Sequence, residues 1–292
     1  MEQTNSYNFR FINLYSGSSG NSTYIKTPDA ELLFDAGKSA KALKTALSGI
    51  GADIKNIDAV FITHEHSDHI SALKVLLKSN PIYIHAVAPT ANYIECCGPA
   101  SRLIIKHPPI YCVRFGNTTV SSVITSHDSV SSVGYRIDYD DGICRHSFAI
   151  ATDTGCITNN MAEMLRGCEA VMLESNHDLN MLLAGPYPQP LKARVMSARG
   201  HLSNDDCASF SAELSKSGTK SIMLAHLSAE NNTPRKALET VGKALEGLDV
   251  FLTVACQNAQ TTLFEFNEPQ NSFSVSDKAL CDQAFDNQIN SQ

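Results

Sequence analysis

The sequence predicts an α/β protein built as a four-layer αββα sandwich, in which two β-sheets pack face to face and helices cover both outer sides. The prediction rests on a series of strand patterns in the first half of the chain, followed by alternating helix and strand patterns. With 43% hydrophobic and 18% charged residues, a chain of 292 residues can bury a sizeable core. No internal repeat is visible. We expect one domain over residues 1–266 and a polar tail over residues 267–292, either a surface appendage or disordered.

Short β-prone runs separated by turn residues dominate the first half of the chain. The strands expected there are Phe9–Tyr15, Thr23–Lys26, Glu31–Asp35, Ala59–Thr63, Ile82–His85, Ile110–Phe115, Thr118–Thr125, Val133–Tyr139 and Phe148–Thr152. Gly116 and Asn117 separate two of these strands and predict a hairpin. Helices are expected at Lys38–Leu47 and at Asp68–Ser79, the second with a broad apolar face and Ser67 as its cap.

Helices and strands alternate in the second half of the chain. The expected helices are Asn160–Arg166, Asn204–Ser217 and Arg235–Glu246, and the expected strands are Ala170–Glu174, Lys220–Ala225, Val250–Ala255 and Thr261–Phe266. Ser203 or Asn204 is expected to cap the second of these helices, and Pro234 to begin the third. The three prolines of Gly185–Pro190 predict an irregular segment there.

The composition narrows the class of protein and its compartment. A formal net charge of −7 argues against a protein that coats nucleic acid non-specifically, although a local basic patch remains compatible with it. The first twenty residues contain no basic start followed by an apolar run, and no stretch of roughly 18 apolar residues occurs anywhere. The nine cysteines are odd in number and scattered. We therefore expect a cytoplasmic protein with reduced thiols and no membrane partner.

The densest chemical signal is an HxHxDH string that begins at His64, directly after an expected buried strand. His64 and His66 are two residues apart on extended backbone, so both side chains can project to one side and hold one metal ion. Asp68 and His69 follow in the first turn of the next helix and can hold a second ion. Imidazoles and carboxylates at this density resist burial unless they are paired or bound to metal.

Four ligands are too few for two metals, so further ligands must come from later in the chain. His127, Asp153 and His226 each follow the end of an expected strand and are expected to converge on one edge of the sandwich. Taken singly, the two histidines could be structural, and Asp153 could be a turn residue before a Thr-Gly pair. With the upstream string present, we expect all three to be metal ligands.

The HxHxDH string and the three later ligands, in this order, resemble the metallo-β-lactamase superfamily over residues 9–266. The resemblance implies a hydrolase with two metals, in which His64, His66 and His127 bind the first, Asp68, His69 and His226 bind the second, and Asp153 bridges them. Asp35 would be the superfamily's supporting aspartate, which orients the ligand loop.

Four further segments resemble the WalJ (YycJ) group of this superfamily: Ser16–Ser22, Glu174–Asp178, Gly200–Asn204 and Ala225–Ser228. That group is regarded as DNA-directed phosphodiesterases with 5′→3′ exonuclease-like activity, related to tRNA 3′-processing and β-CASP nucleases. The resemblance therefore implies a nuclease with nucleic acid as substrate, DNA ahead of RNA. No large cap is inserted between Asp153 and His226, unlike in β-CASP enzymes, which leaves recognition to short loops such as Ser175–Gly200.

Three residues are candidates for catalysis, namely Asp68, His201 and Glu174. His201 precedes an expected helix, and its imidazole either binds phosphate and protonates a leaving group or merely lies at the surface. Glu174, at the end of an expected strand, is expected to orient His201 or a metal ligand. His177 is either an extra ligand or substrate contact, or an ordinary loop histidine.

A larger set of side chains is expected to contact substrate: Ser18, Asn21, His177, Lys192, Arg194, Arg199 and Ser203. The Ser16–Ser22 turn either presents backbone donors to a phosphate or is only a flexible hairpin. The basic residues between Pro186 and Ser203 form a run without acids, which is either a phosphate-steering patch or a solvated face.

The expected mechanism is hydrolysis by a hydroxide held between two divalent metals, which lower the pKa of bound water toward roughly 7. Asp68 would hold this hydroxide and accept its proton. The metals and His201 would stabilise the charge of the transition state, and His201 or a metal-bound water would protonate the leaving oxygen. Zinc is the expected metal, and manganese or iron also fit such ligands.

Other activities of the same fold remain as alternatives. A hydrolase of small thioesters, lactones or cyclic phosphodiesters would use the same ligands, and a non-catalytic metal-binding regulatory domain would keep the fold. A flavodiiron-type oxidoreductase is disfavoured because a glutamate usually replaces the histidine at His66. A true β-lactamase is disfavoured because those enzymes are exported and lack an aspartate like Asp153.

Overall fold

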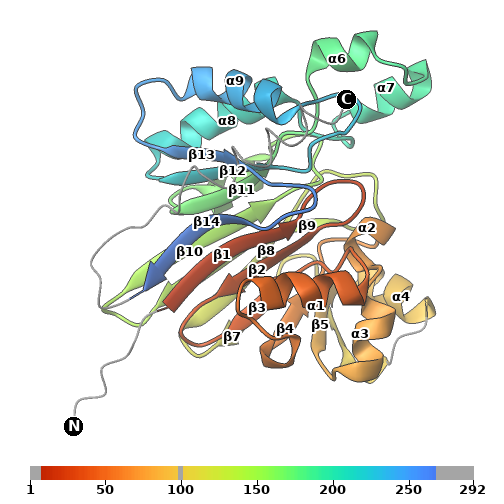
Figure 1. The fold of residues 1–292 in the computed structure, drawn as a ribbon, viewed down its shortest axis with the longest axis vertical. Helices are drawn as coiled ribbons and strands as arrows, with labels where there is room; N and C mark the ends of the chain where they lie inside the picture. Colours follow the sequence, from red (N-terminus) through yellow and green to blue (C-terminus); the bar gives the residue numbers. More distant parts are fainter. Residues whose placement is uncertain (1–7, 98–100, 268–292) are drawn as a thin grey trace.

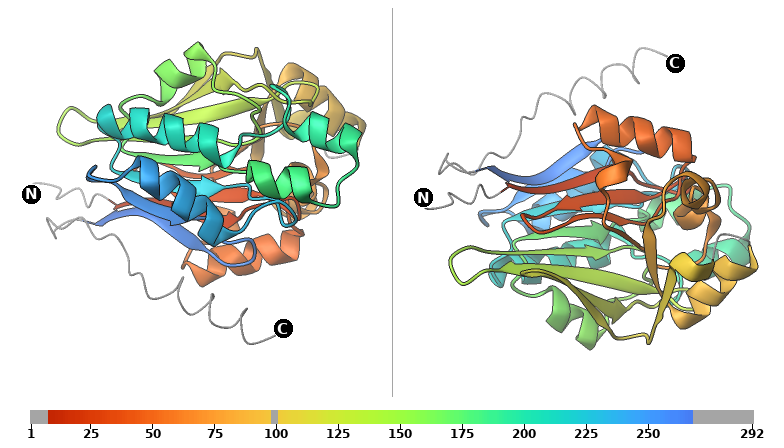
Figure 2. Two further views of the ribbon diagram at one scale, coloured as in Figure 1. Left: turned by 90° about the horizontal axis from the view of Figure 1, so that it is seen from above. Right: turned by 90° about the horizontal axis from the view of Figure 1, so that it is seen from below.

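The computed structural model describes residues 8–97 and 101–267, and it confirms the four-layer sandwich (Figure 1). Two seven-stranded sheets lie face to face, and helices cover the outer side of each (Figure 2). The tail predicted over residues 267–292 lies, apart from its first residue, outside the described residues. None of the described helices is long and apolar enough to span a membrane.

The first sheet has the strand order β14-β1-β2-β3-β4-β5-β6. Its strands are β1 (Asn8–Tyr15), β2 (Ser22–Lys26), β3 (Glu31–Phe34), β4 (Ala59–Phe61), β5 (Tyr83–Val87), β6 (Ile104–His107) and β14 (Thr261–Asn267). Pairing is antiparallel from β14 to β3 and parallel from β3 to β6. β14 thus places the end of the described chain beside its first strand.

The second sheet has the strand order β13-β12-β11-β10-β9-β8-β7. Its strands are β7 (Cys112–Phe115), β8 (Thr118–Ile124), β9 (Val133–Asp140), β10 (Arg145–Ala151), β11 (Ala170–Glu174), β12 (Ser221–Ala225) and β13 (Phe251–Val254). β7 to β10 form the expected antiparallel meander, and β10 to β13 are parallel. Because β8 and β10 are both antiparallel to β9, they run in the same direction as β11 and β12.

Helices pack on both sheets through apolar faces. The first sheet carries α1 (Ala40–Gly49), α3 (Leu73–Ser79) and α4 (Ala88–Cys96), and the second carries α5 (Asn159–Leu165), α8 (Asn204–Lys216) and α9 (Pro234–Ala244). The short helices α2 (Ser67–Ile70), α6 (Leu179–Ala184) and α7 (Gln189–Val195) lie at one end of the sandwich (Figure 1). Two 3₁₀ turns, η1 (Ile54–Asn56) and η2 (Ser101–Leu103), complete the described elements.

The central core lies between the two sheets and is rich in aromatic rings. Phe61 of the first sheet stacks on Phe34 at 5.4 Å between ring centroids. Phe148 of the second sheet meets Phe11 of the first at 5.8 Å. Aromatic pairs of this kind add to the gain from area burial, and together they hold the two sheets in register.

Three local expectations are wrong. One continuous helix over Asp68–Ser79 was expected, but α2 ends at Ile70 and α3 begins at Leu73. Ser67 is not the cap of that helix, because His66 occupies the N-cap position without a side-chain bond. Gly185–Pro190 is not irregular throughout, since α7 begins at Gln189 and a proline is tolerated in the first helical turn. α4, α6 and β6 were not anticipated.

The other sequence signals for helix starts and turns agree with the structure. Ser203 caps α8 by accepting a hydrogen bond from the Asp206 amide, and Pro234 is the first residue of α9. The hairpin between β7 and β8 turns at Gly116, whose φ is 55°. This backbone conformation favours glycine over other residues, as the turn signal predicts.

We expect Phe148→Ala to lower the free energy of unfolding by about 3–5 kcal/mol, because truncation of a buried phenylalanine leaves a cavity. Phe148 is 0% exposed and packs against Phe11 and Phe264. Ile143→Ala is the control, since that side chain is 88% exposed and its loss should stay within about 0.5 kcal/mol. Urea denaturation measures both changes, and equally small shifts would show that the sheets do not share a packed core.

Candidate metal centre

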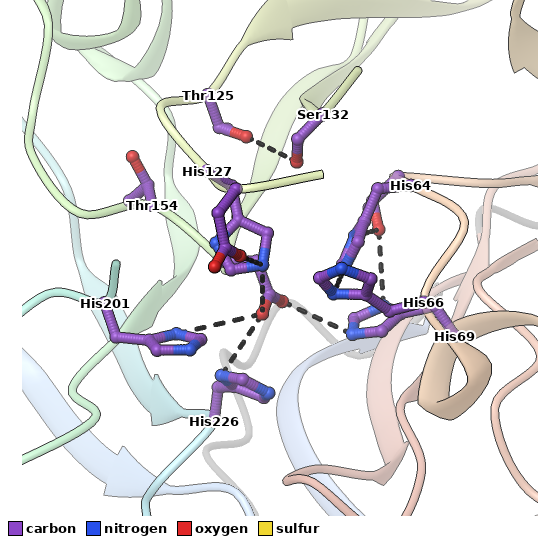
Figure 3. Close-up of polar contacts among 12 residues, drawn as sticks. His64, His66, His69, Thr125, His127, Ser132, Thr154, His201 and His226 are labelled. Atoms are coloured by element: carbon purple, nitrogen blue, oxygen red, sulfur yellow. Dashed lines mark hydrogen bonds and ion pairs between the residues drawn. The ribbon is translucent and has the colours of Figure 1, made fainter. Parts of the chain in front are cut away.

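One edge of the sandwich collects polar side chains from the ends of strands in both sheets. In the first sheet, β4 leads directly into the loop that begins at His64. In the second sheet, β8, β10 and β12 lead to His127, Asp153 and His226. Strands that run in one direction end at one edge, so side chains far apart in sequence become neighbours there. Figure 3 shows the imidazoles of these segments pointing toward one another.

Three imidazoles form one group of potential metal ligands. His64, His66 and His127 each offer a ring nitrogen, and these atoms lie within 4.8 Å of one another. His64 Nε2 and His66 Nδ1 are 3.0 Å apart, with the two rings nearly perpendicular at 79°. Two histidines on extended backbone therefore face a common point, and His127 closes the group from the other sheet.

A second group combines Asp68, His69 and His226, whose ligand atoms also lie within 4.8 Å of one another. Asp153 lies between the two groups. Its Oδ2 is 3.4 Å from His69 Nε2, and its Oδ1 is 3.8 Å from His127 Nε2. The structure thus brings together the seven side chains that the sequence singled out, with Asp153 where a bridging carboxylate would be.

The chemistry of this donor set fits divalent cations. His127 Nε2, His226 Nε2 and Asp153 Oδ2 are buried atoms without a hydrogen-bond partner among the described residues. A buried polar atom without a partner carries the full cost of its desolvation, which a bound cation would remove. Imidazole nitrogens and carboxylate oxygens in this proportion suit zinc, and they also accommodate manganese or iron.

The backbone is strained at three positions of the site. Asp35, Asp153 and His226 have φ values of 62°, 54° and 57°, and they are the only non-glycine residues with positive φ in the described part of the chain. Each lies just beyond the end of a strand, where the chain turns sharply away from the sheet. Such conformations are costly for residues with a Cβ and persist only where the surroundings enforce them.

Asp35 stabilises the loop of His64 to His69 through hydrogen bonds. Its Oδ1 accepts a hydrogen bond from the Thr63 amide at 2.8 Å, and its Oδ2 accepts one from the Thr63 hydroxyl at 2.9 Å. Oδ2 also accepts from His69 Nδ1 at 2.7 Å, which leaves His69 Nε2 directed at the centre. Burial lowers the pKa of His69, but the carboxylates of Asp35 and Asp153 outweigh it and raise the pKa to about 10. The centre is therefore strongly attractive to positive charge.

Glu174 holds two histidines with one carboxylate. Its Oε1 accepts from His201 Nδ1 at 2.7 Å and from His226 Nδ1 at 2.9 Å, while Oε2 accepts from the Thr154 amide at 2.8 Å. Burial raises the pKa of Glu174, but the larger combined effect of His201 and His226 lowers it, so the carboxyl group is ionised. The expectation that Glu174 orients His201 or a metal ligand is matched by contacts to both. Glu174 can therefore position both rings.

His201 lies beside both ligand groups. Its ring centroid is 5.1 Å from that of His127 and 5.2 Å from that of His226, and its side chain is 22% exposed. Burial lowers the pKa of His201, but the carboxylate of Glu174 more than offsets this and raises it. The imidazole is thus anchored at Nδ1 and more readily protonated than an ordinary histidine.

His177 and Ser203 lie next to each other and are paired by an isolated β-bridge. His177 is 2% exposed, and its Nδ1 has no hydrogen-bond partner among the residues that the structure describes. Burial lowers the pKa of His177 and keeps the ring neutral. The Ser203 hydroxyl accepts from the Asp206 amide and donates to its carboxylate at 2.6 Å. Ser203 is therefore engaged in capping α8.

The Ser16–Ser22 turn forms one wall of the centre. Asn21 Nδ2 lies 3.1 Å from Asp68 Oδ2 and 3.0 Å from His69 Nε2, so Asn21 positions ligands of the second group. The Ser16 hydroxyl accepts from the His226 amide at 2.8 Å. Ser18 is exposed at the tip of the turn. Of the two turn residues expected to contact substrate, Asn21 is directed at the ligands and Ser18 at solvent.

The basic run between Pro186 and Ser203 does not form a single patch. Lys192 is 5% exposed and donates to the Leu183 carbonyl at 2.5 Å, so its ammonium group is not available at the surface. Arg194 forms an ion pair with Asp128. Arg199 donates to the His127 carbonyl at 3.2 Å. The geometry removes Lys192 from the expected substrate contacts, because its charge serves to join α6 to α7.

Asp128 and Glu65 are two site residues that the sequence did not single out. Asp128 Oδ1 is 3.4 Å from His127 Nε2 and is buried without a hydrogen-bond partner among the described residues. Glu65 accepts from the Val130 amide at 2.7 Å and ties the HxHxDH loop to the loop that carries His127. Both directly adjoin predicted ligands in sequence, which was the one signal that could have indicated them.

Comparisons with known proteins identify the family of the chain. A family model described as "Beta-lactamase superfamily domain" matches residues 31–227. Exodeoxyribonuclease WalJ of Streptococcus pneumoniae is 36% identical over 246 residues, which cover 83% of this chain and 90% of that protein. Exodeoxyribonuclease YycJ of Bacillus anthracis is 36% identical over 244 residues, covering 81% of this chain and 89% of that protein.

Solved structures support the fold. The metallo-beta-lactamase fold protein YhfI from Bacillus subtilis superposes with a TM-score of 0.66 at 16% sequence identity, over 87% of this chain and 99% of that one. The short form of human tRNase Z gives a TM-score of 0.60 at 16% identity, over 87% and 99% of the two chains. At such identities the likeness concerns the fold alone.

We expect Asp35→Asn to weaken metal binding by about 10–100-fold, because the amide no longer supplies the negative charge that orients His69. Metal affinity is measured by titration of the metal-free protein with zinc against a competing chelator. Asp58→Asn is the matched control, because Asp58 also accepts a backbone hydrogen bond, from the Glu31 amide, but lies outside the centre. Equal zinc affinity in the two variants would contradict the role assigned to Asp35.

Proposed function

The chain belongs to the beta-lactamase superfamily and, within it, to the group of the WalJ and YycJ proteins, and from this premise we propose that it is a dinuclear metal-dependent phosphodiesterase that degrades DNA as a 5′→3′ exonuclease. The observation that carries the proposal is the convergence of seven ligand side chains beside the His201–Glu174 pair. The WalJ and YycJ relatives, both exodeoxyribonucleases by name, support DNA as the substrate.

The proposed metals are two divalent ions, zinc by the preference of the donor set, held by the two ligand groups with Asp153 between them. When bound, such ions stabilise negative charge on phosphate oxygens and lower the pKa of bound water toward neutrality. The residues of the chain then have to orient the phosphodiester, remove a proton from the attacking water and supply a proton to the leaving oxygen.

Asp68 is the proposed acceptor of the proton from the attacking water. Burial raises the pKa of Asp68, but the neighbouring imidazoles of His226 and His69 outweigh this and lower it, so the carboxylate is ionised. Its side chain is 21% exposed, in contrast to the fully buried His69. Asn21 fixes its orientation through a hydrogen bond of 3.1 Å. An ionised and oriented carboxylate at the opening of the centre can accept a proton there.

His201 is the proposed donor of a proton to the leaving oxygen. Its Nδ1 is bonded to Glu174, so Nε2 is the nitrogen that can face substrate. The carboxylate of Glu174 raises the pKa of His201, so the ring is more readily protonated than an ordinary histidine. The location of the ring beside both ligand groups fits a scissile phosphate bound between them.

The rival function is hydrolysis of a small ester or cyclic phosphodiester at the same centre. Arg199 favours a polyanionic substrate, because its guanidinium contacts a backbone carbonyl of the His127 loop and is not paired with a carboxylate among the described residues. We also propose that the protein works in the cytoplasm, which the buried thiols of Cys168 and Cys207, outside any disulfide, support.

We expect Asp68→Ala to abolish turnover of DNA and of bis-p-nitrophenyl phosphate alike, since both reactions need the same proton acceptor and the same ligand. Asp205→Ala, in the exposed first turn of α8, is the control and should keep full activity. Rates on labelled single- and double-stranded DNA, RNA, bis-p-nitrophenyl phosphate and a thioester form the assay. Activity of the Asp68 variant equal to that of the wild type would refute the mechanism.

His201→Gln should separate polymer cleavage from cleavage of the activated ester. A missing general acid slows DNA hydrolysis by about 100-fold or more, whereas p-nitrophenolate departs without a proton and its release should slow by less than about tenfold. Steady-state rates on both substrates, with metal content measured in parallel, test this. An equal loss on the two substrates at unchanged metal content would show that His201 does not protonate the leaving group.

A further inference from the structure

Lys38 lies at the rim of the centre, on the side of the second ligand group. It directly follows Gly37, where an added Cβ would overlap the carbonyl oxygen of Asp68. The Gly37 amide donates to the Asn21 carbonyl at 2.9 Å, and the Asn21 amide donates to the Asp68 carbonyl at 2.8 Å. The backbone that carries Lys38 is therefore packed against the ligand loop without space for a side chain between them.

The ammonium group of Lys38 is oriented by uncharged partners. Nζ donates to Ser19 Oγ at 2.8 Å and to Asn258 Oδ1 at 3.4 Å, and it lies 5.5 Å from the centroid of the Tyr15 ring. Gln257 Nε2 donates to the same Ser19 hydroxyl at 3.2 Å. Within the described part of the chain, no carboxylate forms an ion pair with Lys38. Its positive charge is thus held in place and is not neutralised.

The basic residues between Pro186 and Ser203 differ in their availability. Arg194 is neutralised by Asp128, and Lys192 is buried against a carbonyl. The Arg199 guanidinium donates to the His127 carbonyl, beside the first ligand group, and forms no ion pair with a carboxylate in the described part of the chain. Lys38 therefore adjoins the second ligand group through the Asp68 loop, and Arg199 adjoins the first through the His127 carbonyl, each without a carboxylate partner among the described residues.

We propose that Lys38, with Ser19 and Asn258, is a phosphate-binding position for a nucleic-acid strand that crosses the metal centre toward Arg199. The inference rests on the proposed function and deepens it, because it assigns the substrate as a strand with phosphates beyond the scissile one. A small ester occupies the centre alone and has no group that reaches Lys38. A strand places a second phosphate at the rim, where a fixed ammonium group adds a charge-assisted hydrogen bond.

The test measures binding and turnover separately on the metal-loaded protein. The binding probe is a fluorescein-labelled single-stranded oligodeoxynucleotide with phosphorothioate linkages, which resists hydrolysis, and anisotropy gives its Kd over a series of KCl concentrations. Lys38→Ala is expected to raise this Kd about fivefold at low salt and to reduce the slope of log Kd against log salt by about 0.7, the value for one phosphate contact on a single strand. Lys38→Arg should restore binding to within about twofold of the wild type.

Lys41→Ala is the matched control, because Lys41 carries the same charge three residues later in the sequence and is exposed in the first turn of α1. It should leave Kd and the salt slope unchanged. A Kd and salt slope for Lys38→Ala equal to those of Lys41→Ala would overturn the inference, as would a wild-type protein that does not bind the probe.

Turnover of bis-p-nitrophenyl phosphate separates this outcome from failure of the proposed function. This small substrate has no second phosphate, so its hydrolysis by the wild-type protein and by the Lys41→Ala control reports on the metal centre alone. Hydrolysis without any effect of Lys38 on oligonucleotide binding would overturn the phosphate position and leave the phosphodiesterase intact. Binding that depends on Lys38 without hydrolysis of any phosphodiester would overturn the proposed function and leave the phosphate position intact.

Discussion

The attraction between divalent cations and a buried cluster of imidazoles and carboxylates is the interaction on which the rest of this structure depends. Asp68, Asp153 and Glu174 lie among histidines whose ligand atoms include several without any partner among the described residues. Charged and polar groups are costly to bury unless they are paired or bound to metal. The fold therefore supplies the residues that hydrogen-bond the ligand side chains from outside, and the proposed ions would supply the positive charge at the centre.

The sandwich supports this cluster by holding the ligands from outside. Asp35 and Glu174 each bond the far nitrogen of a ligand histidine, so the near nitrogen faces the centre. Three strand ends adopt left-handed backbone to aim their side chains inward. Such strain is tolerated because the strands behind it are anchored in apolar cores on both sides of each sheet. The stability of the packed layers thus offsets the unfavourable backbone conformations at these three strand ends.

The distribution of charge reconciles an acidic protein with the polyanionic substrate that we propose. The chain has a formal net charge of −7, and basic residues such as Lys106, Arg136 and Arg194 form ion pairs with carboxylates. Lys38 and Arg199 keep unneutralised charge at the rim, whereas Arg194 is occupied by Asp128. Local charge next to the ions matters more than the total, because interactions beyond roughly 10 Å are screened by salt. A strand can therefore be attracted at the centre and repelled elsewhere.

The sequence by itself determined the fold class and the identity of the seven candidate ligands, because both depend on local patterns. Alternating strand and helix signals mark the layers, and a histidine or aspartate just after a strand lies at the sheet edge whatever surrounds it. Only the tertiary structure decided how the remaining polar residues are used. Lys192 points into the α6–α7 pair, Arg194 meets Asp128, and Asn21 turns to Asp68 across 47 positions of sequence. These contacts depend on long-range packing, which places side chains from separate segments within reach and leaves no trace in local sequence patterns.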